Sequence, residues 1–195
     1  MRNQYLFILV TCFLIGACSP KYKNPHIEIQ TSKGEIEVEL YPDQAPKTVQ
    51  AFLSYIKKGY YNNSSFYRVL NDDNQPSNAD KAELIQGGMY KSNFKVHDTL
   101  TGIPHESTAQ THILHKKGTI SLARLAPGTA TSEFFICLSD QPGFDYGGEN
   151  NPDKQGYAAF GKVIKGMDIV NKIYNQNEEN QSFDPPVAIY DIVQL

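Results

Sequence analysis

Residues 27–40 read IEIQTSKGEIEVEL, a stretch in which apolar and polar side chains alternate on both sides of a short polar segment. Ile27 and Ile29 alternate with polar neighbours, and after Gly34 a second run alternates isoleucine, valine and leucine with glutamate. Because side chains on a strand point alternately to its two faces, this pattern predicts a hairpin of two strands. One face of the hairpin would lie in a core and the other in water, as is typical of antiparallel sheets.

Two other segments carry the apolar periodicity of helices. Pro46 suits the first turn of a helix, and apolar residues follow at 49, 52, 53 and 56 until Gly59 ends the run. A second and weaker amphipathic stretch begins near Gly166. The remaining apolar runs are short and strand-like, and they cover residues 65–70, 83–86, 118–123, 133–138, 158–164 and 187–193. Many short strands with only two helices predict a mainly β fold, an antiparallel barrel or sandwich.

The length and composition fit one globular domain with a targeting segment. The chain has 195 residues, of which 40% are hydrophobic and 20% charged, and its formal net charge is -3. A domain of this size buries a continuous core without disulfides or metal ions. The acidic balance lacks the basic surface of a nucleic-acid-binding protein, so we expect no nucleic-acid partner.

The first 17 residues have the organisation of a secretory signal peptide. Arg2 supplies a positive charge, and residues 5–15 form an apolar stretch that is too short to span a membrane comfortably. Two small residues follow, and their position directly before Cys18 resembles a bacterial lipobox. In a lipobox the cysteine thiol receives a lipid and becomes the new N-terminus.

These features predict a lipoprotein signal peptide in residues 1–17, a lipidated tether in 18–25 and a folded domain in 26–195. We expect the lipid on Cys18 to anchor the protein in a bacterial cell envelope, facing outside the cytoplasm at the inner or the outer membrane. The alternative is a plain signal peptide whose cleavage site falls near a cysteine. A lipidated Cys18 would leave Cys137 without a disulfide partner, so we expect Cys137 to pack as a small buried hydrophobe.

Four motifs in the same order resemble the cyclophilin family. They are Phe66-Tyr67-Arg68-Val69, then Ile85-Gln86-Gly87-Gly88, then residues 118–124 with 132–136, and finally residues 159–167. Over residues 26–195 the chain is similar to cyclophilin-type peptidyl-prolyl cis/trans isomerases, with the predicted helices in the matching gaps. The resemblance implies a closed eight-stranded antiparallel β-barrel capped by two α-helices. It also implies an enzyme that rotates X-Pro bonds, here in exported or envelope proteins, and so assists folding.

The chemistry of that reaction needs no nucleophile, metal or proton transfer. Amide resonance creates a rotational barrier of about 20 kcal/mol, and the resonance is lost in the twisted state. A catalyst therefore needs an apolar pocket for the proline ring and a donor aimed at the amide. Both lower the barrier only if they act more strongly on the twisted state than on either planar state.

Strand parity predicts which side chains share a face of the sheet. Residues two apart point the same way, which pairs Phe66 with Arg68, Leu84 with Gln86 and Glu133 with Phe135. The resemblance implies that Arg68 hydrogen-bonds the substrate amide, that Gln86 holds the guanidinium, and that Phe135 completes the catalytic set. Further substrate contacts are implied for Phe66, Leu84, Ala123, Arg124, Glu133, Phe144 and Tyr157, with Ala123 and Arg124 acting chiefly through their backbone.

Several residues depart from the pattern of the family. Residues 71–81 and 90–117 look like insertions, and Glu83 falls where relatives usually place an aromatic residue. Either the pocket loses one wall there, or the insertion shifts the register. Glu133 replaces the glutamine common in the family, and by parity it would face the groove beside Phe135. We hypothesise that its charge steadies Arg68 or favours basic residues beside the substrate proline; a solvated carboxylate of little effect is the alternative.

The sequence offers no convincing metal or cofactor motif. The histidines at 105, 112 and 115 have no recognised ligand spacing, and residues 145–155 form a polar loop without the EF-hand pattern. We therefore expect a monomer without metal or cofactor that acts on proline-containing polypeptides. The alternative function is a non-catalytic chaperone or scaffold that binds proline-containing segments on the same barrel.

Overall fold

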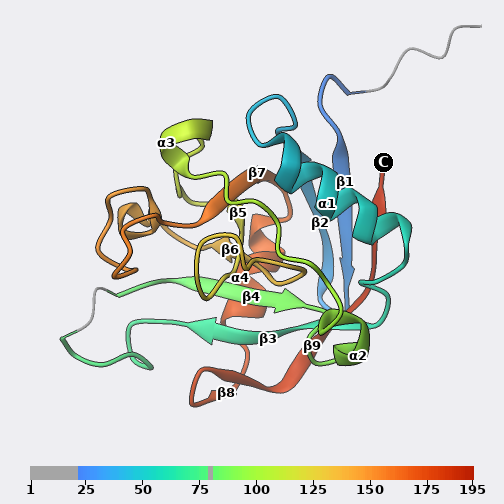
Figure 1. Ribbon diagram of the computed structural model, residues 1–195. Helices are drawn as coiled ribbons and strands as arrows, with labels where there is room; N and C mark the ends of the chain where they lie inside the picture. The colour runs from blue at the N-terminus through green and yellow to red at the C-terminus, as the bar shows by residue number, and fades with distance from the viewer. Residues whose placement is uncertain (1–21, 79–80) are drawn as a thin grey trace, which may run out of the picture.

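The computed structural model describes residues 22–78 and 81–195, and its strands form a barrel with helices around it (Figure 1). The strands are β1 (His26–Thr31), β2 (Gly34–Leu40), β3 (Ser64–Leu70), β4 (Leu84–Gly88), β5 (Thr119–Leu122), β6 (Phe134–Cys137), β7 (Ala158–Lys165), β8 (Glu178–Glu179) and β9 (Ser182–Gln194). The helices are α1 (Pro46–Lys57), α2 (Phe94–His97), α3 (Thr108–Thr111) and α4 (Met167–Tyr174), with a 3-10 turn η1 (Pro142–Phe144). The predicted signal peptide and Cys18 lie outside the described residues.

Eight of the strands form a closed ring in the order β1-β2-β7-β5-β6-β4-β3-β9, and pairing of β1 with β9 completes it. Neighbouring strands of the ring run antiparallel. The short β8 pairs with β9 beside the ring. The prediction of a mainly β fold with a closed eight-stranded antiparallel barrel is therefore confirmed.

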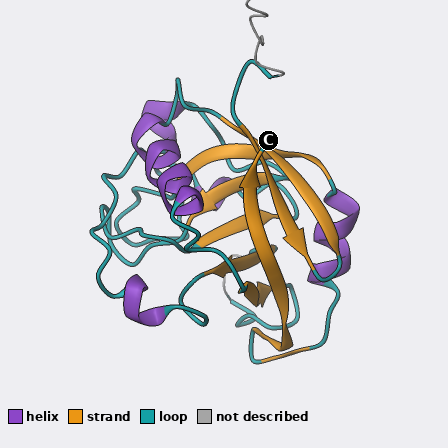
Figure 2. Ribbon diagram, turned by 90° about the vertical axis from the view of Figure 1, so that its right-hand side faces the viewer, coloured by secondary structure: helices purple, strands orange, loops and turns teal. Residues whose placement is uncertain are grey.

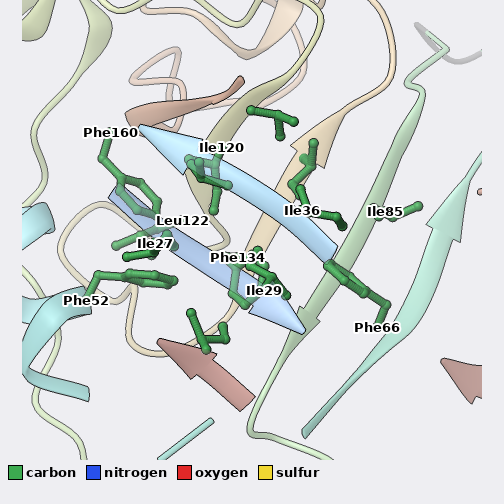
Figure 3. Close-up of a cluster of buried hydrophobic side chains, with 14 of the residues drawn as sticks. Ile27, Ile29, Ile36, Phe52, Phe66, Ile85, Ile120, Leu122, Phe134 and Phe160 are labelled. Carbon is green, nitrogen blue, oxygen red and sulfur yellow. The ribbon is translucent and has the colours of Figure 1, made fainter. Parts of the chain in front are cut away.

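The hairpin predicted for residues 27–40 is formed by β1 and β2. Its register joins Ile27 to Val38 and Ile29 to Ile36, and all four side chains are fully buried. Aromatic rings fill the interior beside them, and Phe52 of α1 packs edge-to-face on Phe134 of β6 with ring centroids 5.6 Å apart (Figure 3). Alternation in the sequence thus places one face of the hairpin in the barrel core.

The two helices predicted from periodicity are α1 and α4, which lie on opposite sides of the barrel (Figure 2). α1 begins at Pro46, and Gly59 follows its C-terminal end with a positive φ of 66°, a conformation that glycine adopts without strain. α4 begins after Gly166, which also has a positive φ, and it buries Val170 and Ile173. α1 therefore starts and stops where the sequence indicated, and α4 starts where it indicated.

The prediction of two helices was incomplete, because α2 and α3 form in the segment 90–117. Each has only four residues, which is too short for a helical period to be recognised in the sequence. The segment that contains them does not project from the barrel into solvent. Ile103 and Ile113 of the same segment are buried in the main core, so this insertion is packed into the domain.

The segment 90–117 also holds the N-terminus of α1. Glu106 is buried, and its carboxylate accepts hydrogen bonds from the backbone N–H groups of Lys47 and Thr48 at 3.1 and 2.8 Å. The Thr48 hydroxyl donates a third bond at 2.7 Å. α1 has no side-chain cap from its own N-cap residue, so Glu106 satisfies the free donors and places a negative charge at the positive end of the helix.

Within residues 22–78 and 81–195, every helix is too short or too polar to cross a membrane.

Candidate active site

A groove of about 560 Å³ opens beside β3, β4 and β6, and it gathers residues from distant parts of the chain. Nine of the ten residues predicted for catalysis or substrate binding line it: Arg68, Leu84, Gln86, Ala123, Arg124, Glu133, Phe135, Phe144 and Tyr157. The tenth, Phe66, does not. Aromatic residues and Arg68 both line this groove, so it has an apolar part and a polar part.

Phe66 was expected on the same face as Arg68, and that prediction was wrong. Phe66 is fully buried in the main core, where it packs edge-to-face on Phe134 (Figure 3). The pairing of β3 with β4 changes register between Phe66 and Arg68, so that Phe66 lies opposite Gly87 while Arg68 lies opposite Gln86. This irregularity breaks the alternation of a regular strand, and two residues two apart come to face opposite sides.

Two amide oxygens hold the Arg68 guanidinium in the groove. Nη1 donates to Gln86 Oε1 at 3.1 Å, as predicted, and Nη2 donates to Gln181 Oε1 at 2.8 Å. Gln181 lies in the turn between β8 and β9 with a φ of 68°, and its own amide nitrogen donates to the Asn74 carbonyl oxygen at 3.0 Å. The inserted residues 71–81 thus reach Arg68 through Gln181, which no pattern in the sequence had indicated.

Three aromatic rings form the apolar end of the groove. Phe135, Phe144 and Tyr157 pack pairwise edge-to-face with centroids 5.1 to 5.5 Å apart, the arrangement that the charge distribution of aromatic rings favours. Leu84 lies beside them in a buried cluster separate from the main core. The surface is apolar and preformed, and is therefore suited to a compact apolar ring such as that of proline.

His115 supports the pocket from behind. Its ring is buried, with Nδ1 2.7 Å from Asp145 Oδ1 and Nε2 2.9 Å from the Ser121 hydroxyl, and it stacks on Phe135 with centroids 6.0 Å apart. Burial lowers the pKa of His115, while the hydrogen bond and charge of Asp145 oppose the change. A neutral imidazole that bridges Asp145 and Ser121 fixes the position of the ring beneath Phe135.

Arg124 lines the groove, and its side chain is held beside it, where a role chiefly for its backbone was expected. The guanidinium donates to both Asp153 oxygens at 2.7 and 2.8 Å and to the Gly156 carbonyl oxygen at 2.8 Å. It also lies 5.4 Å from the Tyr157 ring centroid. The hydrogen bonds from Arg124 lower the pKa of Asp153 to about 2. Arg124 therefore ties the loop of residues 145–155 to the groove.

Glu133 lines the groove as predicted, and the alternative of a solvated carboxylate is wrong. The residue is 9% exposed, so it is no solvated carboxylate. Its carboxylate accepts hydrogen bonds from the Tyr67 hydroxyl at 2.6 Å, the Tyr90 backbone N–H at 3.0 Å and the Ser132 hydroxyl at 3.0 Å, so it reaches Arg68 only through other side chains. Burial raises the pKa of Glu133, and these three hydrogen bonds partly oppose that change.

Glu83 lies outside the groove lining, and its carboxylate accepts a hydrogen bond of 3.2 Å from the Tyr174 hydroxyl on α4. Leu70 and Leu84 line that part of the groove. Aliphatic side chains thus line the groove at Leu70 and Leu84, whereas Glu83, at the position where an aromatic residue is usual in relatives, points to α4.

The second insertion also lines the groove. His97, Asp98 and Leu100 of residues 90–117 contribute to its wall, and His97 Nε2 lies 3.4 Å from the Thr131 hydroxyl in the segment that connects β5 to β6. Sequence reasoning had assigned no role to these three residues. Across the described ranges 22–78 and 81–195, no three His, Cys, Asp or Glu side chains gather as a metal site would require.

Residues 26–194 match the family model described as cyclophilin type peptidyl-prolyl cis-trans isomerase. A peptidyl-prolyl cis-trans isomerase of Acinetobacter baylyi is 38% identical over 153 residues, covering 78% of this chain and 73% of that protein. Peptidyl-prolyl cis-trans isomerase A of Dickeya dadantii is 34% identical over 184 residues, covering 92% and 88%.

Solved structures give the same fold. A cyclophilin-type isomerase of Cryptosporidium parvum superposes with a TM-score of 0.69 at 24% identity, covering 88% of this chain and 98% of that one. A second structure of that protein, determined in the presence of the dipeptide Ala-Pro, superposes with a TM-score of 0.66 at 25% identity, covering 86% and 97%.

Proposed function

The chain belongs to the cyclophilin-type peptidyl-prolyl cis-trans isomerases, and we propose that it acts as a lipid-anchored monomer at a bacterial cell envelope. It catalyses rotation about the X-Pro bonds of polypeptides. The observation that carries the residue assignment is the position of Arg68, which two amide oxygens hold in one groove with an aromatic pocket.

The reaction needs that pocket and that donor together. The rings of Phe135, Phe144 and Tyr157 receive the proline ring, which keeps the bond's proline side still while the carbonyl side turns. In the twisted state the proline nitrogen loses resonance and regains a lone pair, to which the Arg68 guanidinium donates. This donor acts more strongly on the twisted state than on either planar state, and therefore lowers the barrier.

All of these groups come from one chain, which supports a monomer as the active form. Arg68 already carries its charge at any physiological pH, and its hydrogen-bond partners are neutral amides. The site therefore stabilises charge redistribution within the amide without taking up or releasing a proton.

The envelope location rests on the N-terminal sequence. A positive charge, an apolar stretch and two small residues precede Cys18, which is the order of a lipoprotein signal peptide. Cleavage before Cys18 leaves seven residues, 19–25, between the lipidated cysteine and the start of β1 at His26. Such a tether would hold the groove near a membrane, where exported polypeptides fold.

Expression of the full chain and of Cys18→Ser in a bacterium tests the anchor. We expect the native protein in the membrane fraction with a lipid label on Cys18, and the variant without the label and released from the membrane. Equal release of both proteins, without a label on the native chain, would contradict the anchor while leaving the isomerase assignment intact.

A further inference from the structure

Four side chains form a continuous hydrogen-bond chain beside the groove, from Glu133 to Arg68. The Tyr67 hydroxyl donates to Glu133 Oε2 at 2.6 Å, and Gln86 Nε2 donates to the Tyr67 hydroxyl oxygen at 3.0 Å. Arg68 Nη1 then donates to Gln86 Oε1 at 3.1 Å. Glu133 is therefore connected to the guanidinium through two intervening side chains.

The two ends of this chain are ions with opposite hydrogen-bonding roles. A guanidinium has only donors, so Gln86 must present its oxygen to Arg68 and turn its NH2 group towards Tyr67. An ionised carboxylate has only acceptors, so the Tyr67 hydroxyl must give its proton to Glu133 and accept the amide of Gln86. While Glu133 is ionised, every donor in the chain therefore points in one direction.

We propose that Glu133 is a positioning residue for the isomerase reaction, because its carboxylate holds the Gln86 amide through Tyr67 in the orientation that receives Arg68. This inference rests on the isomerase activity and on the role of Arg68. A protonated Glu133 is also a donor, so it no longer fixes the direction of the Tyr67 hydroxyl. The Gln86 amide then loses one of the two constraints on its orientation, because Arg68 still requires its oxygen but the Tyr67 hydroxyl can turn its own proton towards the NH2 group.

The surroundings of Glu133 are built to keep the carboxylate in place. Its other oxygen accepts bonds from the Tyr90 backbone N–H and the Ser132 hydroxyl, both at 3.0 Å. Gly88 packs directly on it: a Cβ at this position would lie 2.5 Å from Glu133 Oε1, and φ there is +147°. The close approach of backbone and carboxylate requires glycine at position 88.

The titratable groups around Glu133 come from three parts of the fold. Tyr67 of β3 donates to it, His97 of α2 lies near enough for its charge to favour the ionised form, and Tyr61 in the core is affected by its charge. The charge of Arg68 acts on Tyr67. Burial dominates over the favourable contacts and raises the pKa of Glu133 above that of an exposed glutamate.

This raised pKa gives activity and stability opposite dependences on pH. As pH falls through the pKa of Glu133, the hydrogen bonds that lead from Arg68 to Glu133 lose their fixed direction. We therefore expect kcat/KM to fall. The folded state then binds a proton that the unfolded state still lacks, so protonation of Glu133 favours the folded state between the two pKa values. Loss of activity without loss of structure distinguishes this effect from acid unfolding.

The test measures kcat/KM for an X-Pro peptide against pH, using the full chain and three variants. Glu133→Gln keeps an acceptor for Tyr67 but cannot titrate, so we expect its acid limb to be flat whatever its activity at neutral pH. Tyr67→Phe removes the hydroxyl that connects Glu133 to Gln86, so we expect kcat/KM at neutral pH to fall by up to about tenfold, as for the loss of one hydrogen bond. Tyr90→Phe is the matched control, because Tyr90 contacts Glu133 through its backbone, and its profile should follow the native one.

Two results would overturn the proposal. One is a native profile without an acid limb above the pKa of an ordinary glutamate. The other is the same limb in Glu133→Gln, which would assign the titration to another group, such as His97. Circular dichroism at each pH must show that the native protein stays folded. A native chain without isomerase activity at neutral pH would instead contradict the proposed function, before any comparison of profiles.

Discussion

Arg68 is held between two glutamine side chains that reach it from opposite directions. Gln86 is its cross-strand neighbour on β4, whereas Gln181 comes from a turn more than a hundred residues later in the chain. Gln181 adopts a φ of 68°, a conformation that is uncommon for residues other than glycine and that carries strain. The turn therefore holds Gln181 in a strained conformation directly beside Arg68.

Replacement of Gln181 by alanine should loosen Arg68 while the barrel stays folded. Removal of one hydrogen bond to a charged group predicts a fall in kcat/KM of about tenfold, measured in an isomerase assay on an X-Pro peptide. Asn180→Ala is the control, since Asn180 is exposed in the same turn and shares the positive φ. Equal losses in both variants would attribute the effect to the turn's backbone rather than to the Gln181 amide.

At the scale of elements, the segment 90–117 connects the stability of α1 with the shape of the groove. Glu106 receives three donors at the start of α1, while His97, Asp98 and Leu100 of the same segment line the groove. An insertion that only lengthened a surface loop would neither bond to α1 nor line the groove. The segment is therefore a structural part of the domain as well as a wall of the site.

Glu106→Ala should destabilise the domain by about 1–3 kcal/mol, because buried donors at the start of α1 would lose their acceptor. Urea unfolding measures this loss. Glu149→Ala is the control: Glu149 forms an exposed pair with Lys154, and its removal should change the free energy of unfolding by less than about 0.5 kcal/mol. Equal stabilities of the two variants would show that Glu106 does not cap α1.

Regular elements could be predicted from the sequence because each carries its own period. The hairpin of residues 27–40 and the helix from Pro46 show this, since their apolar positions repeat and their turns contain glycine or proline. The burial of Cys137 was likewise predicted, and it is confirmed. Local periodicity therefore accounts for the barrel strands and the two longer helices, whereas most of the groove lining was implied by the resemblance to the cyclophilin family.

The remaining features depend on contacts between segments far apart in the chain. Phe66 was misplaced because the register change in β3 is set by its partners β4 and β9, which nothing in the residues of β3 itself records. Gln181 and Glu106 were missed for a related reason, because their partners lie 113 and 58 or 59 positions away. Hydrogen bonds between polar side chains leave no repeating pattern in a sequence.

On the scale of the whole molecule, closure of the barrel explains how such distant residues meet. β4 lies between β3 and β6 in the ring, so Arg68, Gln86 and Phe135 come from three successive strands. β9 borders β3 on the other side and carries the turn with Gln181 to the same place. The site is therefore a property of the closed sheet, and a rigid ring keeps donor and pocket in a fixed relation.

If Arg68 lowers the rotational barrier of the X-Pro bond, its removal from a folded protein must slow the reaction. kcat/KM for an X-Pro peptide is measured for the native full chain, Arg68→Lys and Arg68→Ala, with circular dichroism to confirm that each is folded. We predict a loss of about 10²-fold or more for Arg68→Ala, as for removal of an aimed donor. Arg68→Lys should retain part of the activity, because lysine keeps the positive charge but lacks the paired N–H donors of the guanidinium. A folded Arg68→Ala protein with native kcat/KM would contradict the account.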